Sequence, residues 1–261
     1  MKNFLTANLT KGRYEKDSIT LLLKAQIENS LSLGWEPEDI ILLTNFKFDF
    51  MGVKSLKTNL NNICFTGSKM FGMKYLFNKQ INDVIWAHDL DAWQNVPFCC
   101  PEFKDVGIAC YSNTKYNGGS IFWRQTAQDI VYKIVSEIET NNENKEEPTL
   151  NRVLKSKKYK KRVTNINNTF NVGCSGYVKR WDRSIKPIRV CHFHPYNRIA
   201  WETHALDRNG LDVKGISDRL EKLLRKYYPF LANELSKHGA IAQKERKLTR
   251  LSSSENHSTR K

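Results

Sequence analysis

The sequence predicts an α/β fold in which a mostly parallel sheet is flanked by helices. Short apolar runs, typical of strands, alternate with longer stretches whose apolar residues recur every three or four positions, typical of helices. The 261 residues are 40% hydrophobic, which is enough for the core of one domain. We therefore expect one main α/β domain with a C-terminal helical extension.

The expected strands are short, apolar and bounded by polar or glycine-containing segments. They lie over residues 4–9, 39–44, 53–56, 83–88, 106–111 and 119–123. Helical stretches separate several of them. This alternation favours parallel pairing, because parallel neighbours need a long crossover connection.

The expected helices begin at residues that can cap them. Asp17 or Ser18 starts a helix that ends near Gly34, and Ser68 starts one that runs through Leu76. Further helices are expected over residues 126–138, 150–154 and 216–228.

Basic charge is concentrated in two segments. Residues 152–189 hold twelve Lys and Arg against one acid, and residues 236–261 hold seven against two, within a formal net charge of +15. Such a surface favours polyanionic partners, although a solvated face with a basic tail gives the same pattern. We expect a main domain over residues 1–215, a helical extension over 216–238 and a basic, disordered tail over 239–261.

Two features bear on location. No run of about 18 apolar residues is present, so no membrane-spanning helix is expected. Residues 1–6 lack the apolar region of a secretory signal. We therefore expect a cytoplasmic protein whose six cysteines, which form no Cys-x-x-Cys pair, are free thiols.

Two aspartates follow the apolar run over residues 83–88. The chain there reads His88-Asp89-Leu90-Asp91. Residues i and i+2 of an extended chain point to the same side, so both carboxylates can face one cation. Ligands of open α/β sheets bind at the carboxyl ends of the strands. Although Asp-x-Asp is common at strand ends, this context favours a divalent cation that bridges a diphosphate.

A second apolar run ends in His192-Phe193-His194. An imidazole beside two carboxylates suits Mn²⁺ better than Mg²⁺, which prefers oxygen ligands. The alternative is a pair of histidines held by hydrogen bonds in the core.

Two further segments carry polar groups suited to a ligand. Asn117-Gly118-Gly119 precedes a strand, and paired glycines allow a tight turn and close approach of backbone to a ligand. Glu146 and Glu147 open an apolar helix, where the helix dipole favours acids in any case. A plain hairpin turn and a helix start are the structural alternatives for these two segments.

In this order, the segments resemble nucleotide-sugar-dependent glycosyltransferases of the GT-A fold, nearest to the glycogenin-like and bacterial galactosyltransferase-like group. The resemblance covers residues 4–200. It implies a Rossmann-like sheet and transfer of a sugar from a nucleoside-diphosphate sugar, UDP-hexose above all, to an acceptor hydroxyl. The implied cofactor is Mn²⁺ or Mg²⁺. The implied acceptor is a glycan, a protein or another hydroxyl compound, polyanions included.

The resemblance implies roles on the nucleotide side of the site. Residues 5–14 look like the family's first strand and nucleotide-binding loop, in which backbone at Leu9 and Thr10 holds the base and Tyr14 covers it. Lys69 stands where the family has a basic residue that reaches the phosphate or the sugar, and Lys74 is the second choice.

The resemblance also implies roles around the reacting sugar. Asp89 and Asp91 match the pair that binds the metal and the donor ribose, and His192 matches the third metal ligand. The segment 117–119 is similar to the one that lines the donor sugar. Residues 146–151 look like the acidic segment near the reacting carbon.

That acidic segment makes Glu146 or Glu147 the expected catalytic acid. If the reaction inverts stereochemistry, one of them is the general base. If it retains stereochemistry, as the resemblance favours, the same acid positions the acceptor or stabilises an oxocarbenium-like centre.

The sequence departs from the family at two places. After His192-Phe193 the family often has Gly and then Lys-Pro-Trp, whereas this chain has His194-Pro195, so His194 or Arg198 is expected to take over diphosphate binding. Glu also stands where the family usually has Asp, and Pro148 follows it.

Two other functions fit part of the pattern. A metal-dependent nuclease or phosphoesterase would use the same Asp and His ligands, with nucleic acid on the basic segments. A nucleic-acid-binding protein without activity would explain the net charge. It would leave the acidic pair unexplained, because carboxylates repel phosphate unless a metal intervenes.

Overall fold

The computed structural model describes residues 1–9, 16–58, 68–112, 115–143, 146–173, 181–193 and 215–227. The helices are α1 (Lys16–Leu31), α2 (Ser68–Asn78), α3 (Gln128–Thr140) and α4 (Glu146–Lys155), with helical segments over 181–183 and 218–227. The strands are β1 (Lys2–Ala7), β2 (Ile40–Thr44), β3 (Asp49–Phe50), β4 (Val53–Lys57), β5 (Ile85–His88), β6 (Ala92–Gln94), β7 (Val106–Ser112), β8 (Lys115–Trp123), β9 (Val163–Asn165), β10 (Val172–Gly173) and β11 (Val190–His192). The 3-10 turns are η1 (Pro37–Asp39), η2 (Gln125–Ala127), η3 (Lys160–Arg162) and η4 (Asn168–Phe170).

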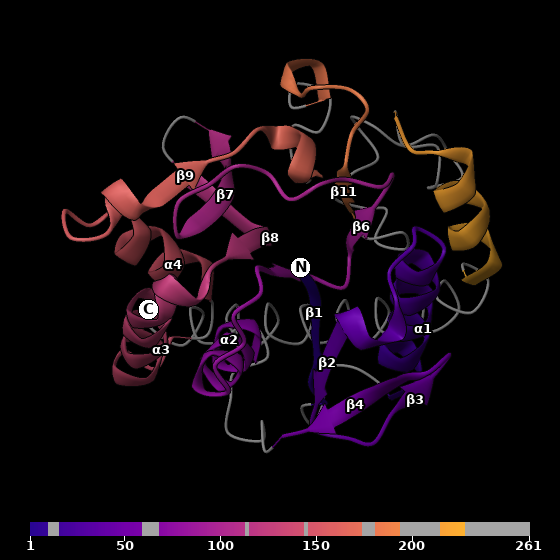
Figure 1. Cartoon of the computed structure of the whole chain (residues 1–261), viewed down its shortest axis with the longest axis horizontal. Coiled ribbons are helices and arrows are strands. Elements are labelled where there is room, and N and C mark those ends of the chain that lie inside the picture. The colour runs from indigo at the N-terminus through magenta and orange to yellow at the C-terminus, as the bar shows by residue number, and fades with distance from the viewer. Residues whose placement is uncertain are drawn as a thin grey trace, which may run out of the picture.

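The main sheet has eight strands in the order β3-β4-β2-β1-β5-β8-β7-β9 (Figure 1). β4, β2, β1 and β5 are parallel neighbours, whereas β8 runs antiparallel to both β5 and β7. β1 lies between β2 and β5, with Phe4 opposite Ile41 on one side and Ala87 on the other. The mostly parallel, helix-flanked α/β fold expected from the sequence is confirmed.

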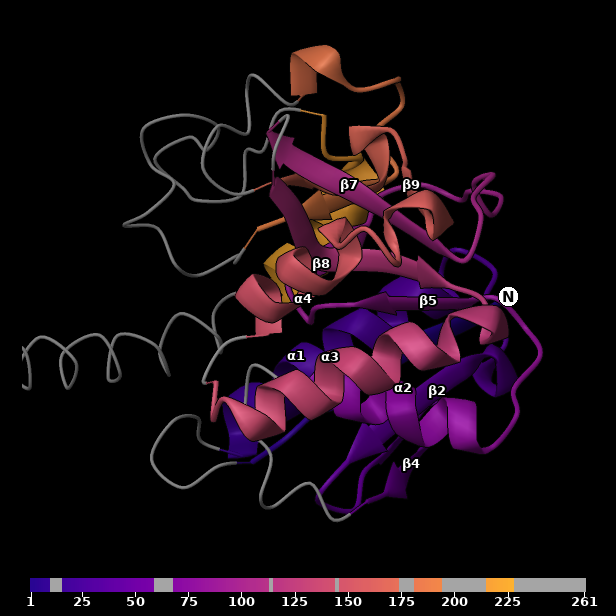
Figure 2. The same cartoon turned by 90° about the vertical axis from the view of Figure 1, so that its left-hand side faces the viewer.

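Helices cover both faces of this sheet. α2 and α3 lie side by side on one face, and α1 covers the other (Figures 1 and 2). Phe4 belongs to the same buried cluster as Met73 of α2 and Ile134 of α3, whereas its neighbour Leu5 belongs to the cluster that contains Leu23 of α1. Successive side chains of a strand point to opposite faces, so β1 contributes to both halves of the core.

A second sheet of three strands, β10-β11-β6, lies beside the main sheet. β6 directly follows the Asp89–Asp91 segment and pairs antiparallel with β11, so that Ala92 lies opposite His192. β10 pairs parallel with β11, which places Gly173 opposite His192. These strands have only two or three residues each, too few for a recognisable alternating pattern, and the sequence did not predict the sheet as a unit.

The helical segment 218–227 packs beside α1. Its Leu220 and Leu224 are buried in one cluster with Trp93 of β6 and Cys191 of β11. Tyr227 Oη donates a hydrogen bond of 2.6 Å to a carboxylate oxygen of Glu28 on α1. The described part of the expected C-terminal helix is therefore present, whereas residues 228–238 and the tail 239–261 lie outside the described residues.

The segment Asn117-Gly118-Gly119 lies inside β8 and not in a turn before it. The strand starts earlier than expected because Tyr116 pairs with Cys110 of β7, and residues 117–119 lie at a register shift between this pair and the pair Ile121–Ile108. All three residues are buried. A Cβ atom at Gly119 would overlap the His192 ring, so this glycine allows close approach, whereas one at Gly118 would make only ordinary contacts.

Two smaller expectations concern thiols and membranes. Within the described ranges, the cysteines at 99, 100 and 110 are free thiols. None of the described helices is both long enough and apolar enough to cross a membrane.

Candidate functional site

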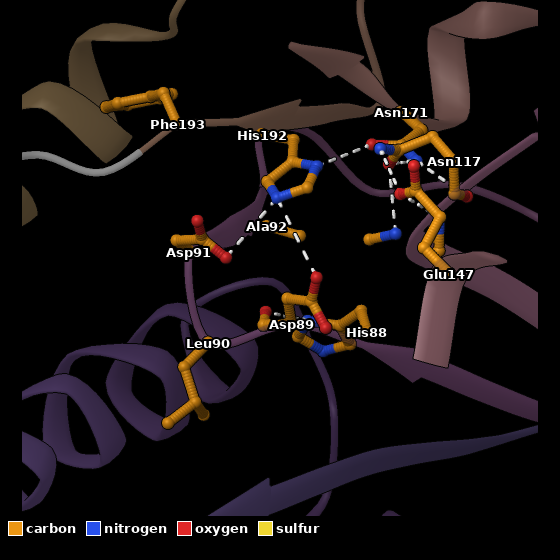
Figure 3. Close-up of polar contacts among 12 residues, drawn as sticks. His88, Asp89, Leu90, Asp91, Ala92, Asn117, Glu147, Asn171, His192 and Phe193 are labelled. Atoms are coloured by element: carbon orange, nitrogen blue, oxygen red, sulfur yellow. Dashed lines mark hydrogen bonds and ion pairs between the residues drawn. The ribbon is translucent and has the colours of Figure 1, made fainter. Parts of the chain in front are cut away.

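Asp89, Asp91 and His192 converge on one point beside the carboxyl end of β5 (Figure 3). Each offers one ligand atom, and the three atoms lie within 4.8 Å of one another. His192 Nε2 lies 3.3 Å from Asp91 Oδ1 and 3.9 Å from Asp89 Oδ2. The residues singled out as metal ligands are distant in sequence and are neighbours in space.

Two backbone ladders produce this convergence. At the end of the β5–β8 ladder, the backbone N–H of Asp89 donates to the carbonyl oxygen of Gly119 at 2.9 Å. In the small sheet, His192 lies opposite Ala92, and the N–H of Phe193 donates to the carbonyl oxygen of Asp91 at 2.9 Å. Asp91 and His192 are thus placed by the same pair of strands.

A buried glutamine of α1 donates hydrogen bonds to the backbone of the acidic segment. Gln26 Nε2 donates to the carbonyl oxygens of Leu90 at 2.8 Å and Ala92 at 3.2 Å, which flank Asp91. The Gln26 side chain is 1% exposed, so water does not compete for these carbonyl groups. The helix therefore fixes the backbone on either side of a candidate metal ligand.

The donor set fits a divalent cation. His192 Nδ1 is 3.1 Å from Asn171 Oδ1, which leaves Nε2 to face the two carboxylates. Three electron-rich ligand atoms that face one another at this range repel unless positive charge lies among them. Two carboxylate oxygens and one imidazole nitrogen are ligands that Mn²⁺ accepts readily. Asp89, Asp91 and His192 would hold the ion.

Lys69 lies directly beside this cluster and is buried. Its Nζ is 2.5 Å from Asp89 Oδ1 and 3.0 Å from Glu146 Oε1, and it donates to the carbonyl oxygen of Gly118. Although burial alone would lower the pKa of Lys69, the two carboxylates outweigh it and raise the pKa above its ordinary value. Lys69 is therefore a charged cross-link between α2, the acidic segment, β8 and α4. That Lys69 contacts a phosphate or the sugar of the donor stays a prediction.

Lys74, the alternative to Lys69 as the basic residue that reaches the donor, contacts α3 instead. Its Nζ lies over the ring of Tyr132 on α3, 5.8 Å from the ring centroid.

Glu146 and Glu147 occupy different environments at the start of α4. Glu146 is buried: one carboxylate oxygen binds Lys69, and the other, Oε2, has no hydrogen-bond partner within the described part of the chain. Burial raises the pKa of Glu146 to about 7; Lys69 opposes this rise and the charge of Asp89 adds to it. Glu146 thus titrates near neutrality.

Glu147 is partly exposed and lies along β8. Its Oε2 is 3.4 Å from Asn117 Nδ2 and 3.5 Å from the backbone nitrogen of Gly118, and its Oε1 is 3.3 Å from Lys115 Nζ. Figure 3 shows Glu147 on the Asn117 side of the cluster, opposite Asp91. Glu147 is therefore the acid of the pair that a ligand could reach.

The expected nucleotide loop is described only at its start. The Leu9 backbone N–H donates to Asn45 Oδ1 at 2.9 Å, and its carbonyl oxygen accepts from Asn45 Nδ2 at 2.9 Å. One amide side chain thus fixes both backbone groups of Leu9. The remaining residues expected to bind the donor, Thr10, Tyr14, His194 and Arg198, lie outside the described residues.

Three polar residues around the site were missed by the sequence analysis: Gln26, Asn45 and Asn171. Each acts on backbone or side chains far away in sequence, and none belongs to a motif. Asn171 ends an asparagine-rich stretch, residues 165–171, and that composition was the only available signal. It does not indicate which asparagine faces the site.

The basic segment after α4 is tied to the body of the protein. Arg162 pairs with Asp105 at 2.5 Å and with Asp129 at 2.9 Å, and Arg152 pairs with two further acids. The lysines between them at 157, 158, 160 and 161 are exposed. Part of the local positive charge is thus paired with acids of the body, whereas these four lysines are exposed.

Comparison with known proteins yields a match in structure and none in sequence. No protein-family model matches the chain, and no curated protein is similar to it. The structure is similar to the glycosyltransferase GlyE of Streptococcus pneumoniae TIGR4, with a TM-score of 0.52 and 13% identity over 91% of this chain and 63% of GlyE. The apo form of GlyE gives a TM-score of 0.50 with the same identity and coverage.

A glycosyltransferase involved in glycosylation of the major capsid of PBCV-1 gives a TM-score of 0.47 with 11% identity over 74% of this chain and 93% of that one, too low to add to the argument. The chain spans less than two thirds of the length of GlyE. The likeness to GlyE shows a GT-A-like glycosyltransferase fold, which is the fold that the sequence resemblance implied.

Proposed function

We propose that this protein transfers a sugar from a nucleoside-diphosphate sugar, UDP-hexose above all, to an acceptor hydroxyl, with a divalent cation held by Asp89, Asp91 and His192. The observation that carries the proposal is the convergence of these three side chains at the carboxyl end of β5 in a GT-A-like fold. A cation bound there, Mn²⁺ or Mg²⁺, would bind the diphosphate and stabilise its growing charge as it leaves.

The charges around the cluster support binding of an anionic donor. Lys69 neutralises much of Asp89, and burial raises the pKa of Glu146 to about 7, which makes its carboxyl easier to protonate than an ordinary glutamate. With a divalent cation present, the cation and Lys69 would bring three positive charges against the two carboxylates of Asp89 and Asp91. Fixed positive charge lowers the barrier where negative charge develops on the leaving group.

Glu147 is the proposed acid at the reacting centre, and Glu146 is the proposed support for Lys69. Glu147 is partly exposed beside the backbone N–H of Gly118, whereas Glu146 is buried against Lys69 Nζ. For an inverting reaction, Glu147 would take the proton of the acceptor hydroxyl. For a retaining reaction, its charge would stabilise an oxocarbenium-like centre or orient the acceptor.

The donor nucleotide would lie along the loop that follows β1. The double hydrogen bond from Asn45 holds the Leu9 backbone in one conformation, and such a fixed backbone is suited to recognise a base. Thr10 and Tyr14, which follow Leu9 in the sequence, are proposed to bind the base as well. The donor-sugar side is proposed to be Asn117, Gly118 and Gly119.

The test is a turnover assay with a panel of UDP-, GDP- and other sugar nucleotides, each with Mn²⁺ or Mg²⁺. The expected result is metal-dependent release of the nucleoside diphosphate from one of them, faster when an acceptor hydroxyl compound is added. Cleavage of polynucleotides or simple phosphoesters without any sugar-nucleotide turnover would instead show a phosphoesterase and overturn the proposal.

A further inference from the structure

A chain of hydrogen bonds connects the β8 backbone to the imidazole of His192. It starts at the backbone N–H of Gly119, which donates to Asn117 Oδ1 at 2.9 Å. A backbone N–H can only donate, so the Asn117 atom that it meets must be the carbonyl oxygen. This contact fixes which way the Asn117 amide is turned, an assignment that is otherwise ambiguous for asparagine.

The next two links follow from the first. Asn171 lies 2.5 Å from the same Asn117 oxygen, so the Asn171 atom in that contact must be the donor Nδ2. Its other terminal atom is then Oδ1, which lies 3.1 Å from His192 Nδ1. An oxygen accepts, so Nδ1 of His192 carries the proton. In the neutral ring, the lone pair therefore belongs to Nε2, the atom that faces Asp89 and Asp91.

The ring has little freedom to leave this orientation. A Cβ atom added at Gly119 would overlap the imidazole, and one added at Gly173 would overlap the backbone and Cβ of His192. Backbone therefore lies against the histidine from two strands, β8 and β10. Figure 3 shows the imidazole between Asn171 on one side and the two aspartates on the other.

Water does not compete for the links of this chain. Asn117, Asn171 and His192 are 4%, 3% and 6% exposed. A buried polar group that loses its partner is costly, so the pattern is strongly favoured over a rearranged one.

We propose that Asn171 is a positioning residue for His192 and that Asn117 acts through Asn171 by fixing its amide. Together they keep the proton on Nδ1 and direct the Nε2 lone pair to the metal position. The inference rests on the proposed function, because it concerns the third ligand of that metal. It gives Asn117 a role in the metal centre that its expected place beside the donor sugar does not include.

The test measures Mn²⁺ binding to the full chain by calorimetry, with no nucleotide present. Asn171→Leu keeps the size of the side chain but removes both polar atoms, and we expect it to weaken Mn²⁺ binding about 10- to 100-fold. Asn171→Ala serves the same purpose should the leucine variant fail to fold. The control is Asn167→Ala in the same region, because Asn167 Oδ1 accepts from the N–H groups of Thr169 and Ile185 and so belongs to a separate set of hydrogen bonds.

A second measurement determines which ring nitrogen of His192 carries the proton. Long-range ¹H–¹⁵N correlation of the histidine rings, with His192→Gln for assignment, should place the proton of the neutral wild-type ring on Nδ1. In the Asn171 variants we expect the proton to move to Nε2 in part of the molecules. A change in stability alone would not produce this signature.

The outcomes separate the inference from the proposed function. Unchanged Mn²⁺ affinity in a folded Asn171 variant, or a wild-type ring with its proton on Nε2, overturns the positioning role and leaves the metal site standing. A wild-type protein that binds no Mn²⁺ overturns the proposed metal site, and the inference with it.

Discussion

Asp91 lies where the chain leaves β5 and enters β6, 3.3 Å from His192 Nε2 and with its side chain only 12% exposed. Removal of its carboxylate takes one of the three candidate ligands from the cation but leaves the backbone ladders intact. We expect Asp91→Ala to lower sugar-nucleotide turnover about a hundredfold or more, since metal charge stabilisation contributes several kcal/mol. Steady-state kinetics and circular dichroism would measure the two effects.

Asp83→Ala is the matched control for this variant. Asp83 precedes β5 at its opposite end, and its half-exposed side chain lies 3.9 Å from the N-terminal amine. We expect near-normal turnover. Asp91→Ala with wild-type turnover would show that the carboxylate does not serve the reaction.

Glu146 makes stability depend on pH. Burial raises its folded pKa to about 7 from 4.5, so between these values the folded state binds more protons than the unfolded state. Stability should therefore fall as pH rises through this window, by up to about 3 kcal/mol. The charged groups that face this carboxyl are Lys69, which opposes the effect, and Asp89 and Glu147, which add to it.

Glu146→Gln should flatten this dependence, because glutamine does not titrate. Urea unfolding at several pH values between about 5 and about 8 would measure it. The same dependence of stability on pH in the wild type and in the glutamine variant would contradict the assignment.

Residue-scale prediction from sequence succeeded where a side chain belongs to a local motif. Asp89 and Asp91 follow an apolar strand, and residues two apart in an extended chain point to the same side, so their common orientation can be predicted from the local sequence. Asn171 and Gln26 could not be found in this way. Asn171 meets His192 Nδ1 through the register of the small sheet, and Gln26 meets the carbonyl groups beside Asp91 because α1 packs against that segment.

At the scale of elements, α1 supports the acidic segment through Gln26. Gln26→Leu removes both hydrogen bonds to the carbonyl oxygens of Leu90 and Ala92 and leaves them buried without this donor. We expect a loss of about 1–3 kcal/mol in stability, and weaker Mn²⁺ binding because Asp91 is less well fixed. Chemical denaturation and calorimetry would measure the two. An unchanged Mn²⁺ affinity would show that α1 stabilises the fold without ordering the ligands.

The helical segment 218–227 contributes to the core beside the small sheet. Leu224 is fully buried in the cluster that contains Trp93 and Cys191. We expect Leu224→Ala to cost about 2–5 kcal/mol, because it removes buried apolar surface and leaves a cavity. Lys222→Ala is the control on the same helix, since Lys222 is exposed. Equal urea midpoints for the two variants would contradict the packing described for this helix.

The elements differ in how well the sequence predicts them. The core-facing positions of α3 recur with clear helical spacing, and the helix appears where this spacing predicts it. Paired glycines favour a turn over residues 117–119, yet the segment lies in β8, where the residues on either side of it pair with β7 across a register shift. Pairing between distant strands of this kind cannot be predicted from a short segment of sequence.

For the molecule as a whole, the fold class was predictable because it depends on the period of apolar residues along the chain. The candidate site depends on contacts between distant segments: β5 and β8 of the main sheet, β6, β10 and β11 of the small sheet, and the buried ends of α2 and α4. Ordered motifs indicated that Asp89, Asp91 and His192 belong together. The hydrogen bonds that orient them required the structure.

The central claim is that these three side chains hold a cation to which the donor diphosphate binds. Calorimetric titration of UDP and of GDP into the full chain, with Mn²⁺ and again with EDTA, tests it most directly. We predict that one of the two nucleotides binds with Mn²⁺ and at least about tenfold more weakly in EDTA, and that Asp91→Ala abolishes the difference. Binding of equal strength with Mn²⁺ and with EDTA, or no binding of either nucleotide, would contradict the account.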